Sequence, residues 1–310
     1  MISLLPDLNK VMEPVLYPEA FDSDDFLFQV KWDGIRILTV VDDKIRLINK
    51  HMRDKTAQYP ELQNLGGSLP VSSAVLDGEV VVLKDGRPSF PSILRRDKAN
   101  IQNVTYLKGL LPVDYMVFDL LYLNGQDLRS KPIEYRLELL HSLITNQANL
   151  HPVEDFLAGK SLFAAVFNMG MEGIVAKKKG SYYSPGKAHQ DWLKVKCRRN
   201  QTCLLGGYTL RGQLVNSLLL GVFRDGSLFY VGRAGSGLTT AQQEILSKQL
   251  PPLKINDSPF ANLPSSRKGY HYVRPLMGVL IEYLEWTEDL NLRNPVIKGF
   301  IDIDPAECCF

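Results

Sequence analysis

The sequence predicts an α+β fold, with mainly antiparallel sheet in residues 1–197 and a compact β-barrel after them. Three observations lead to this prediction. Strand-like runs recur throughout the first part, each bounded by Gly, Asp, Asn or Pro. Helical periodicity occurs in only two stretches between these runs. Short strands separated by glycine turns make up most of the remainder.

The elements of the first part follow from their periodicity. Alternating or apolar runs predict strands at 26–31, 35–41, 44–49, 74–83, 114–122, 172–178 and 192–197. From Pro132 to Ile144, apolar residues recur at helical spacing behind a proline suited to a first helical turn. The stretch 161–169 has the same spacing and predicts a second helix.

The second part is organised differently. The polar, basic stretch 197–202 is the best candidate for a linker, so that two domains are predicted, residues 1–197 and 198–310. Beyond it, strands are predicted at 203–210, 215–223, 227–233 and 278–286, with a helix at 239–250. These segments fit a barrel of about five strands. The stretch 251–270, rich in Pro, Ser and Asn, is predicted to be a long loop.

The composition is that of an ordinary globular protein, 45% hydrophobic and 23% charged over 310 residues. No run approaches the roughly 20 apolar residues of a membrane-spanning helix, and the first residues lack the features of a secretory leader. The four cysteines show no CxxC spacing, which favours reduced thiols over a zinc site. A cytoplasmic protein is expected.

Charge is distributed unevenly, although the net charge is only +2. The segment 177–199 has eight lysines and arginines against one acidic residue, whereas 282–307 has seven acidic residues against two basic ones. The basic segment suits a polyanion such as nucleotide phosphate or a DNA backbone. The alternative is a solvated charged face, and the acidic segment is interpreted as mostly surface.

Lys31 is the strongest candidate for a reactive residue. It lies in the string KWDGIR (31–36), between the apolar strand 26–31 and a glycine turn, which would hold it on a rigid element. A free lysine is almost entirely ammonium at neutral pH and is not a nucleophile, but burial or neighbouring cations lower its pKa. Taken alone, a KxDG string would more simply be a surface strand end with a Lys–Asp pair.

Four further strings follow in order: DGE (77–79), FDLLY (118–122), EGIVAK (172–177) and WLKVK (192–196). Together the five resemble the nucleotidyltransferase motifs of ATP-dependent DNA ligases, most closely those of the ligase module of bacterial end-joining ligases, over nearly the whole chain. The resemblance implies a nucleotidyltransferase (adenylation) domain followed by an oligonucleotide-binding (OB) barrel. It also implies sealing of 3′-hydroxyl/5′-phosphate nicks through a lysyl-AMP and an adenylated DNA end, with ATP and Mg²⁺ or Mn²⁺.

The resemblance assigns the catalytic cations. Lys31 would attack the α-phosphate of ATP, and Arg36, Lys194 and Lys196 would neutralise phosphate charge. Lys194 and Lys196 alternate along one predicted strand and therefore point to the same face. These two ammonium groups are expected to lower the pKa of Lys31. The alternative is an edge strand protected by its lysines.

Carboxylates are implied for ribose and metal binding. Glu79 and Glu172 lie beside glycines in predicted strands, where a ligand can approach the backbone. The matching family positions contact the ribose and a divalent metal, respectively, and both residues are candidate metal ligands. Mg²⁺ bound by one or two carboxylates plus phosphate fits this sparse supply. Asp33 is added as a supporter of the lysine or the metal, the alternative being a turn cap.

The base site is assigned to Phe118, Gln29 and Val30. Phe118 would stack on adenine, although a phenylalanine in an apolar strand is more often core. Gln29 matches a position where related ligases often carry a glutamate that reads the adenine amino group, and glutamine keeps the carbonyl acceptor without the charge. Lys50 replaces an arginine that contacts nucleotide or DNA phosphate, with loss of the bidentate fork.

The largest departure from the family lies near the C-terminus. Related ligases end the barrel with an Arg-x-Asp-Lys motif that orients pyrophosphate during the first step, whereas the corresponding stretch here is GFIDID (299–304). Self-adenylation is therefore expected to be slow, or to rely on Arg293, Lys298 or the Arg267–Lys268 pair.

Two alternative functions stay open, an RNA ligase or capping-type guanylyltransferase, and a non-catalytic nucleic-acid-binding module. The expected partner is nicked double-stranded DNA, to which a monomeric protein would bind in the nucleoid. A Ku-type end-binding partner is implied by the resemblance alone.

Overall fold

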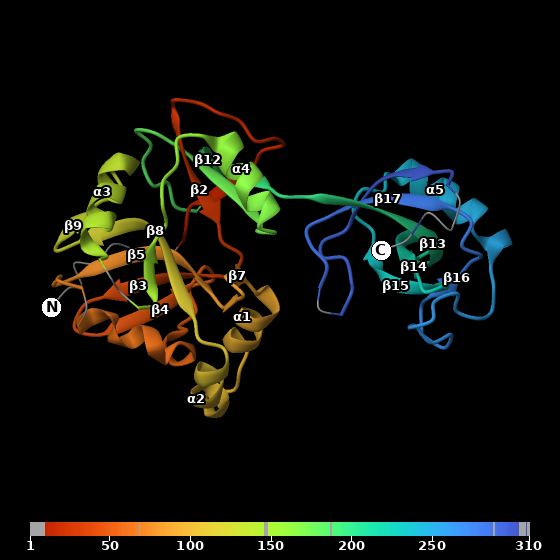
Figure 1. Cartoon of the computed structure of the whole chain (residues 1–310), viewed down its shortest axis with the longest axis horizontal. Helices are drawn as coiled ribbons and strands as arrows, with labels where there is room; N and C mark the ends of the chain where they lie inside the picture. Colours follow the sequence, from red (N-terminus) through yellow and green to blue (C-terminus); the bar gives the residue numbers. More distant parts are fainter. Residues whose placement is uncertain are drawn as a thin grey trace. The chain divides into compact units, whose positions relative to one another are not determined.

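The computed structural model describes residues 10–67, 69–145, 148–186, 188–287, 289–303 and 308. The chain divides into two compact units, Met1–Cys197 and Arg198–Phe310 (Figure 1). Each unit has its own hydrophobic core and is described by itself.

The first unit contains a four-stranded sheet whose three longer strands carry motif residues. Its order is β1 (Glu13–Leu16), β12 (Ala188–Lys196), β11 (Gly173–Lys178) and β2 (Phe26–Lys31). β11 is antiparallel to both of its neighbours, whereas β1 runs parallel to β12. Consequently β2 and β12, which are far apart in the sequence, flank the same central strand.

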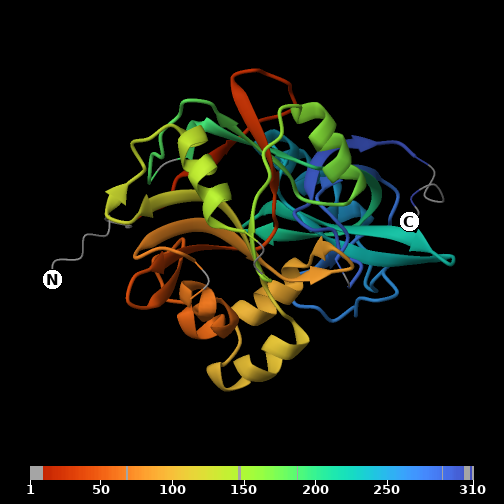
Figure 2. The same ribbon diagram turned by 60° about the vertical axis from the view of Figure 1, so that its left-hand side comes forward.

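A second, larger sheet lies below β2 and β12 in both views (Figure 1, Figure 2). Its path is β10 (Leu150–Pro152), β8 (Asp114–Leu123), β5 (Ala74–Val81), β3 (Ile35–Val41) and β4 (Ile45–Asn49), with β9 (Gln126–Asp127) paired to β8. Only the β10–β8 pair is parallel. A separate small hairpin consists of β6 (Leu83–Lys84) and β7 (Arg87–Pro88).

Helices cover the two sheets. They are η1 (Thr56–Gln58), η2 (Pro60–Gly67), α1 (Phe90–Asp97), α2 (Ile101–Leu110), α3 (Ile133–Leu143) and α4 (Gly159–Asn168). α3 packs against β8, and α4 packs against β2 and β11. The sequence did not predict α1 and α2, because α1 buries one apolar residue, Ile93, and α2 buries two, Val104 and Leu107, which makes a short apolar stripe.

The second unit is a curled antiparallel sheet with the order β15-β14-β13-β17-β18. Its elements are β13 (Arg199–Arg211), β14 (Leu214–Arg224), β15 (Ser227–Ala234), α5 (Thr240–Gln249), η3 (Pro251–Leu253), β16 (His271–Tyr272), β17 (Gly278–Tyr283) and β18 (Val296–Ile301). A backbone bridge between Ser236 and Val296 joins the two edges of the sheet, so that it closes into a barrel. α5 packs on β14.

The α+β class and the small barrel are therefore confirmed, and the predicted helices at 132–144 and 161–169 are α3 and α4. The predicted linker is wrong in part. Residues 199–202 pair with β17 and are the first residues of a barrel strand, because their backbone groups find partners there. Within the described residues, none of the helices is long and apolar enough to cross a membrane.

Candidate active site

Three neighbouring strands arrange the candidate residues in rows. Gly173 in β11 lies opposite both Lys31 in β2 and Lys196 in β12. Residues that lie opposite one another in an antiparallel ladder face the same side, and Gly173 places no side chain between the two lysines. It has a φ of 147°, and a Cβ there would collide with the carbonyl oxygen of Val195. The next row on the same face consists of Gln29, Val175 and Lys194.

Glu172 joins the two lysines of the first row. Its Oε2 lies 2.5 Å from Lys31 Nζ, and its Oε1 lies 2.9 Å from Lys196 Nζ. Burial acts to raise the pKa of the Glu172 carboxyl group, but the two ammonium groups outweigh burial and hold that pKa below its usual range. Glu172 is therefore a carboxylate bridge with both oxygens occupied.

The pKa of Lys31 is raised, which overturns the prediction that its neighbours lower it. Burial does lower this pKa, but the negative charges of Glu172, Glu79 and Asp33 together outweigh burial. In this arrangement Lys31 is an ammonium ion. The lowered pKa belongs to Lys194 instead, because of its burial and the charges of Lys196 and Lys31.

A steep pH dependence follows from this ammonium ion. Well below its pKa, the fraction of neutral lysine rises about tenfold per pH unit. With saturating ATP, we expect the single-turnover rate of any nucleophilic attack by Lys31 to rise with pH between 7 and 9. A quench-flow measurement of covalent label on the protein gives this rate. A flat profile would contradict this prediction, because it would mean that Lys31 is already neutral in the nucleotide complex at pH 7.

Arg36 is anchored within the protein. Its guanidinium donates to both carboxylate oxygens of Asp77, at 2.9 Å and 2.6 Å, and to the carbonyl oxygen of Met12 at 2.7 Å. A weaker contact joins it to the Tyr183 hydroxyl at 3.3 Å. Most of its donors are therefore used internally, so that Arg36 can act on phosphate mainly through its charge.

Glu79 lies beside Arg36 and Lys31. Burial raises the pKa of Glu79 to about 8; Lys31 and Arg36 lower it, while Glu172 and Asp33 raise it further. The carboxyl group of Glu79 is therefore easier to protonate here than that of a free glutamate. Asp33 is close enough to Lys31 and Glu79 to influence both groups.

A pocket opens beside Lys31 between the two sheets of the first unit. Its lining consists of Pro14, Gln29, Val30, Lys31, Trp32, Arg36, Glu79, Phe118, Val175, Lys177 and Trp192. The structure therefore brings together most of the predicted nucleotide-site residues. The indole N–H groups of Trp32 and Trp192 are buried and have no hydrogen-bond partner among the described residues. A buried donor without a partner costs free energy, so that both indole groups are unfavourably placed in this arrangement.

Lys177 was missed as a site residue, although it ends the string EGIVAK. It is 1% exposed and its Nζ donates to the Phe118 carbonyl oxygen at 2.6 Å. The same ammonium group lies 4.8 Å from the centre of the Phe118 ring and 4.5 Å from that of Trp192. Burial lowers the pKa of Lys177 to about 8. The sequence did offer a signal: Lys177 follows Val175 by two positions in a predicted strand, so that both side chains face the same side.

Lys50 lies elsewhere. With Lys10, Glu13 and Gly186 it lines a separate shallow depression, which shares no residue with the pocket beside Lys31. The basic segment 177–199 is also divided by the fold: Lys177 is buried, Lys196 is paired with Glu172, and Lys178 is exposed. Lys187 lies outside the described residues, as do Glu288, Asp304 and Glu307 of the acidic segment.

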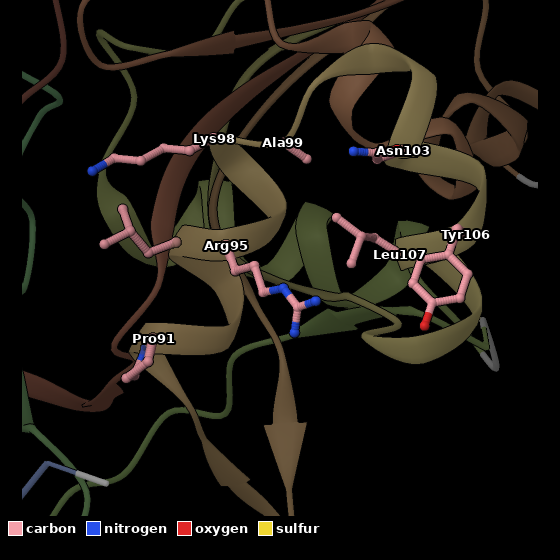
Figure 3. A pocket seen from close by; sticks show the side chains of 8 residues that line it. Pro91, Arg95, Lys98, Ala99, Asn103, Tyr106 and Leu107 are labelled. Carbon is pink, nitrogen blue, oxygen red and sulfur yellow. The ribbon is translucent and has the colours of Figure 1, made fainter. Parts of the chain in front are cut away.

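A larger depression of about 700 Å³ lies between α1 and α2 (Figure 3). Arg95 and Lys98 line it together with Asn103, Tyr106 and neighbouring apolar side chains. The pocket beside Lys31 holds only about 90 Å³. We nevertheless place the chemistry in the smaller pocket, because it contains the amine, the carboxylates and the aromatic rings.

The cations considered for the second unit differ in their surroundings. Arg293 Nη1 lies 2.7 Å from Glu285 Oε1, and Lys298 Nζ lies 3.4 Å from Glu282 Oε2. Arg267 instead stacks over the ring of Tyr270, 4.9 Å from its centre. It has no carboxylate partner within the described part of the chain.

Comparison with known proteins agrees with this fold. Residues 7–196 match the model of the ATP dependent DNA ligase domain, and residues 211–302 match that of the ATP dependent DNA ligase C terminal region. The chain is 35% identical over 296 residues to the multifunctional non-homologous end joining DNA repair protein LigD of Mycobacterium tuberculosis (strain ATCC 25618 / H37Rv). That alignment covers 92% of this chain and 37% of LigD, so the chain spans little more than a third of its relative.

A relative of similar length is DNA ligase C1 of Mycolicibacterium smegmatis, 32% identical over 306 residues, with 91% of this chain and 87% of that protein covered. Among solved structures, mycobacterial DNA ligase D complexed with ATP and MES aligns with a TM-score of 0.57 at 33% identity, over 96% of this chain and 97% of that chain. The ligase domain of M. tuberculosis LigD aligns with a TM-score of 0.55 at 32% identity, over 98% and 99%. These alignments confirm an adenylation domain followed by an OB-fold domain. The chain belongs to the ATP-dependent DNA ligase family.

Proposed function

We propose that the protein is an ATP-dependent DNA ligase that seals 3′-hydroxyl/5′-phosphate nicks during end-joining repair, with Lys31 as the residue that carries AMP. The observation that carries this proposal is the position of Lys31: its amine lies at the edge of the pocket, 2.5 Å from Glu172. A nucleotide base in this pocket would bring its α-phosphate towards the lysine rows. Positioning and charge neutralisation supply most of the catalysis in phosphoryl transfer.

Each lysine of the two rows has a distinct part in this chemistry. Lys31 must lose a proton before it attacks, and Glu172 then loses a cationic partner. Lys196, 2.9 Å from the other oxygen of Glu172, keeps that carboxylate paired. The pKa of Lys194 is lowered by burial and by neighbouring ammonium groups, so that an incoming phosphate would stabilise its charged form.

The carboxylates fit a hard divalent cation such as Mg²⁺ or Mn²⁺. No cluster of three potential protein ligands occurs among the described residues, so that water and phosphate would complete the coordination. The raised pKa of Glu79, caused first by burial, reflects in part the negative charges of Glu172 and Asp33 nearby. One or two of the candidate carboxylates Glu172, Glu79 and Asp33 would hold the ion, which supplies positive charge against the phosphates when bound.

The base pocket distinguishes between the alternatives. A capping-type guanylyltransferase would hold guanine, whereas the pocket offers an aromatic ring at Phe118 and an amide at Gln29 whose nitrogen is already bound by the protein. This arrangement favours adenine. Nicked duplex DNA would be the partner, and a Ku-type end-binding protein is proposed only from the likeness to end-joining proteins.

The direct test is the sealing of a nicked DNA duplex whose 5′-phosphate is radiolabelled. With ATP and Mg²⁺ or Mn²⁺, we expect the label to become resistant to phosphatase and to appear in the longer strand. The same duplex with a gap of one nucleotide is the control. Sealing of an RNA nick in preference to DNA, or binding without sealing, would replace the proposal by one of the two alternatives.

DNA binding by this ligase is expected to weaken strongly with salt. Each phosphate neutralised by lysine or arginine contributes about −0.9 to the slope of log K against log salt concentration. Exposed Lys178 and the neighbouring basic residues would supply such contacts. We expect a slope steeper than about −2 in fluorescence anisotropy with a nicked duplex. A binding constant that is unchanged between 50 and 200 mM salt would contradict a phosphate-based interface.

A further inference from the structure

The Gln29 amide is held in one orientation by a residue outside the motifs. Its Nε2 donates to Asp155 Oδ1 at 2.7 Å. The other carboxylate oxygen, Asp155 Oδ2, lies 3.1 Å from His141 Nε2 in the last turn of α3. An ionised carboxylate only accepts hydrogen bonds, so that this His141 nitrogen carries the proton and the Gln29 nitrogen, not its oxygen, faces Asp155.

The backbone fixes Asp155 in this position. Val153 donates to the Val117 carbonyl oxygen at 2.7 Å, which ties the segment to β8. Phe156 and Phe28 exchange two backbone hydrogen bonds of 2.8 Å, which ties the same segment to β2. Asp155 lies between these two attachments, and Gln29 is the residue after Phe28. Neither side chain therefore depends on a flexible loop for its position.

The remaining end of the amide faces a ligand. Gln29 is 1% exposed and lines the pocket beside Lys31. Its Oε1 accepts no hydrogen bond from any described residue. Because Asp155 holds the amide nitrogen, the group that Gln29 presents to the pocket is the acceptor Oε1. A 6-amino purine would donate to this oxygen, whereas a 6-keto purine would place a second acceptor against it.

We propose that Asp155 is a positioning residue for base selection, which makes the pocket favour 6-amino over 6-keto purines by fixing the Gln29 amide. This inference rests on the proposed function, because it requires that the pocket hold the purine of the nucleotide. Gln29 alone could satisfy either purine by rotating its amide, since its two ends are a donor and an acceptor. Asp155, which only accepts hydrogen bonds, keeps the amide nitrogen on its own side and so prevents that rotation.

The test compares ATP with ITP, which carries a 6-keto group and no 2-amino group. Binding is measured by quenching of tryptophan fluorescence, since Trp32 and Trp192 line the pocket, and covalent labelling is measured with the two α-³²P nucleotides. In Asp155→Asn, the partner can also donate, and the Gln29 amide is free to turn. We expect the ATP:ITP preference to fall by about tenfold, because a buried mismatched pair is relieved.

Two further variants make the result specific. Gln29→Glu combined with Asp155→Asn restores an acceptor-only side chain and should restore the preference for ATP. Asp114→Asn is the matched control, because Asp114 makes a similar 2.9 Å contact with His151 but does not line the pocket. It should leave the preference unchanged.

The outcomes separate this inference from the proposed function. If Asp155→Asn weakens the binding of ATP and of ITP equally and leaves the preference unchanged, Asp155 is merely structural and the inference is overturned. Equal binding of ATP and ITP by the unaltered protein would overturn it as well. Selective ATP binding without any covalent label would support the inference while contradicting the proposed ligase activity.

Discussion

Replacement of Lys31 by alanine or by arginine is expected to abolish covalent AMP attachment. The phosphoramidate of the intermediate requires an amine, and a guanidinium is not a nucleophile at any working pH because its pKa exceeds 12. Lys31→Arg keeps a cation beside Glu172, so that the carboxylate stays paired and the fold is preserved. The measurement is protein-bound label after incubation with α-³²P-ATP and Mg²⁺, with the unfolding temperature of each variant recorded alongside.

Lys55→Ala is the matched control for this experiment. Lys55 is also a partly buried lysine, with its Nζ 2.9 Å from Asp97 Oδ2, but it does not line the pocket. Its replacement should leave labelling intact. The amine of Lys196, 2.9 Å from Glu172, and that of Lys177 in the pocket wall are groups that could take the label instead. Peptide mapping that finds AMP on Lys196, or full labelling of Lys31→Arg, would remove Lys31 from its assigned role.

Local sequence patterns predicted the individual elements well, for reasons that the structure makes plain. The strand 26–31 is β2 without change, because its boundaries are set by a turn on either side. The helix at 132–144 was found because α3 buries four apolar residues along one face, and the helix at 161–169 because apolar residues recur at helical spacing along α4. α1 and α2 have weaker stripes and were missed. What is local in the chain could be predicted.

Contacts between distant residues could not be predicted in the same way. Lys31 and Glu172 are 141 positions apart, and Gln29 and Asp155 are 126 apart. Motif order indicated that the first pair would meet, but no pattern indicated the second. The predicted direction of the Lys31 pKa shift was wrong. The sequence indicated only the neighbouring lysines, whereas the fold also places three carboxyl groups around Lys31. Electrostatic balance depends on distances that spacing does not provide.

Sealing of a pre-adenylated nick is expected to be faster than sealing that starts from ATP, by about a hundredfold. The reason is the stretch 299–304, which lacks the arginine and lysine that orient pyrophosphate in related ligases. Removal of a single preorganised charge-stabilising donor typically costs a factor of about 10²–10³ in rate. The final step expels AMP and not pyrophosphate, so that the missing cations should slow the first step selectively.

Single-turnover rates on the two substrates measure this difference. If adenylation from ATP proves as fast as sealing of the adenylated nick, another cation orients the pyrophosphate. Arg293 and Lys298 are each close to a glutamate, at 2.7 Å and 3.4 Å, which makes them less available to an anion. Arg267, stacked on Tyr270, is the first residue to replace. Arg267→Ala should then slow adenylation without slowing the final step. Arg274→Ala is the matched control, because Arg274 is an exposed arginine in the same segment before β17, and it should slow neither step.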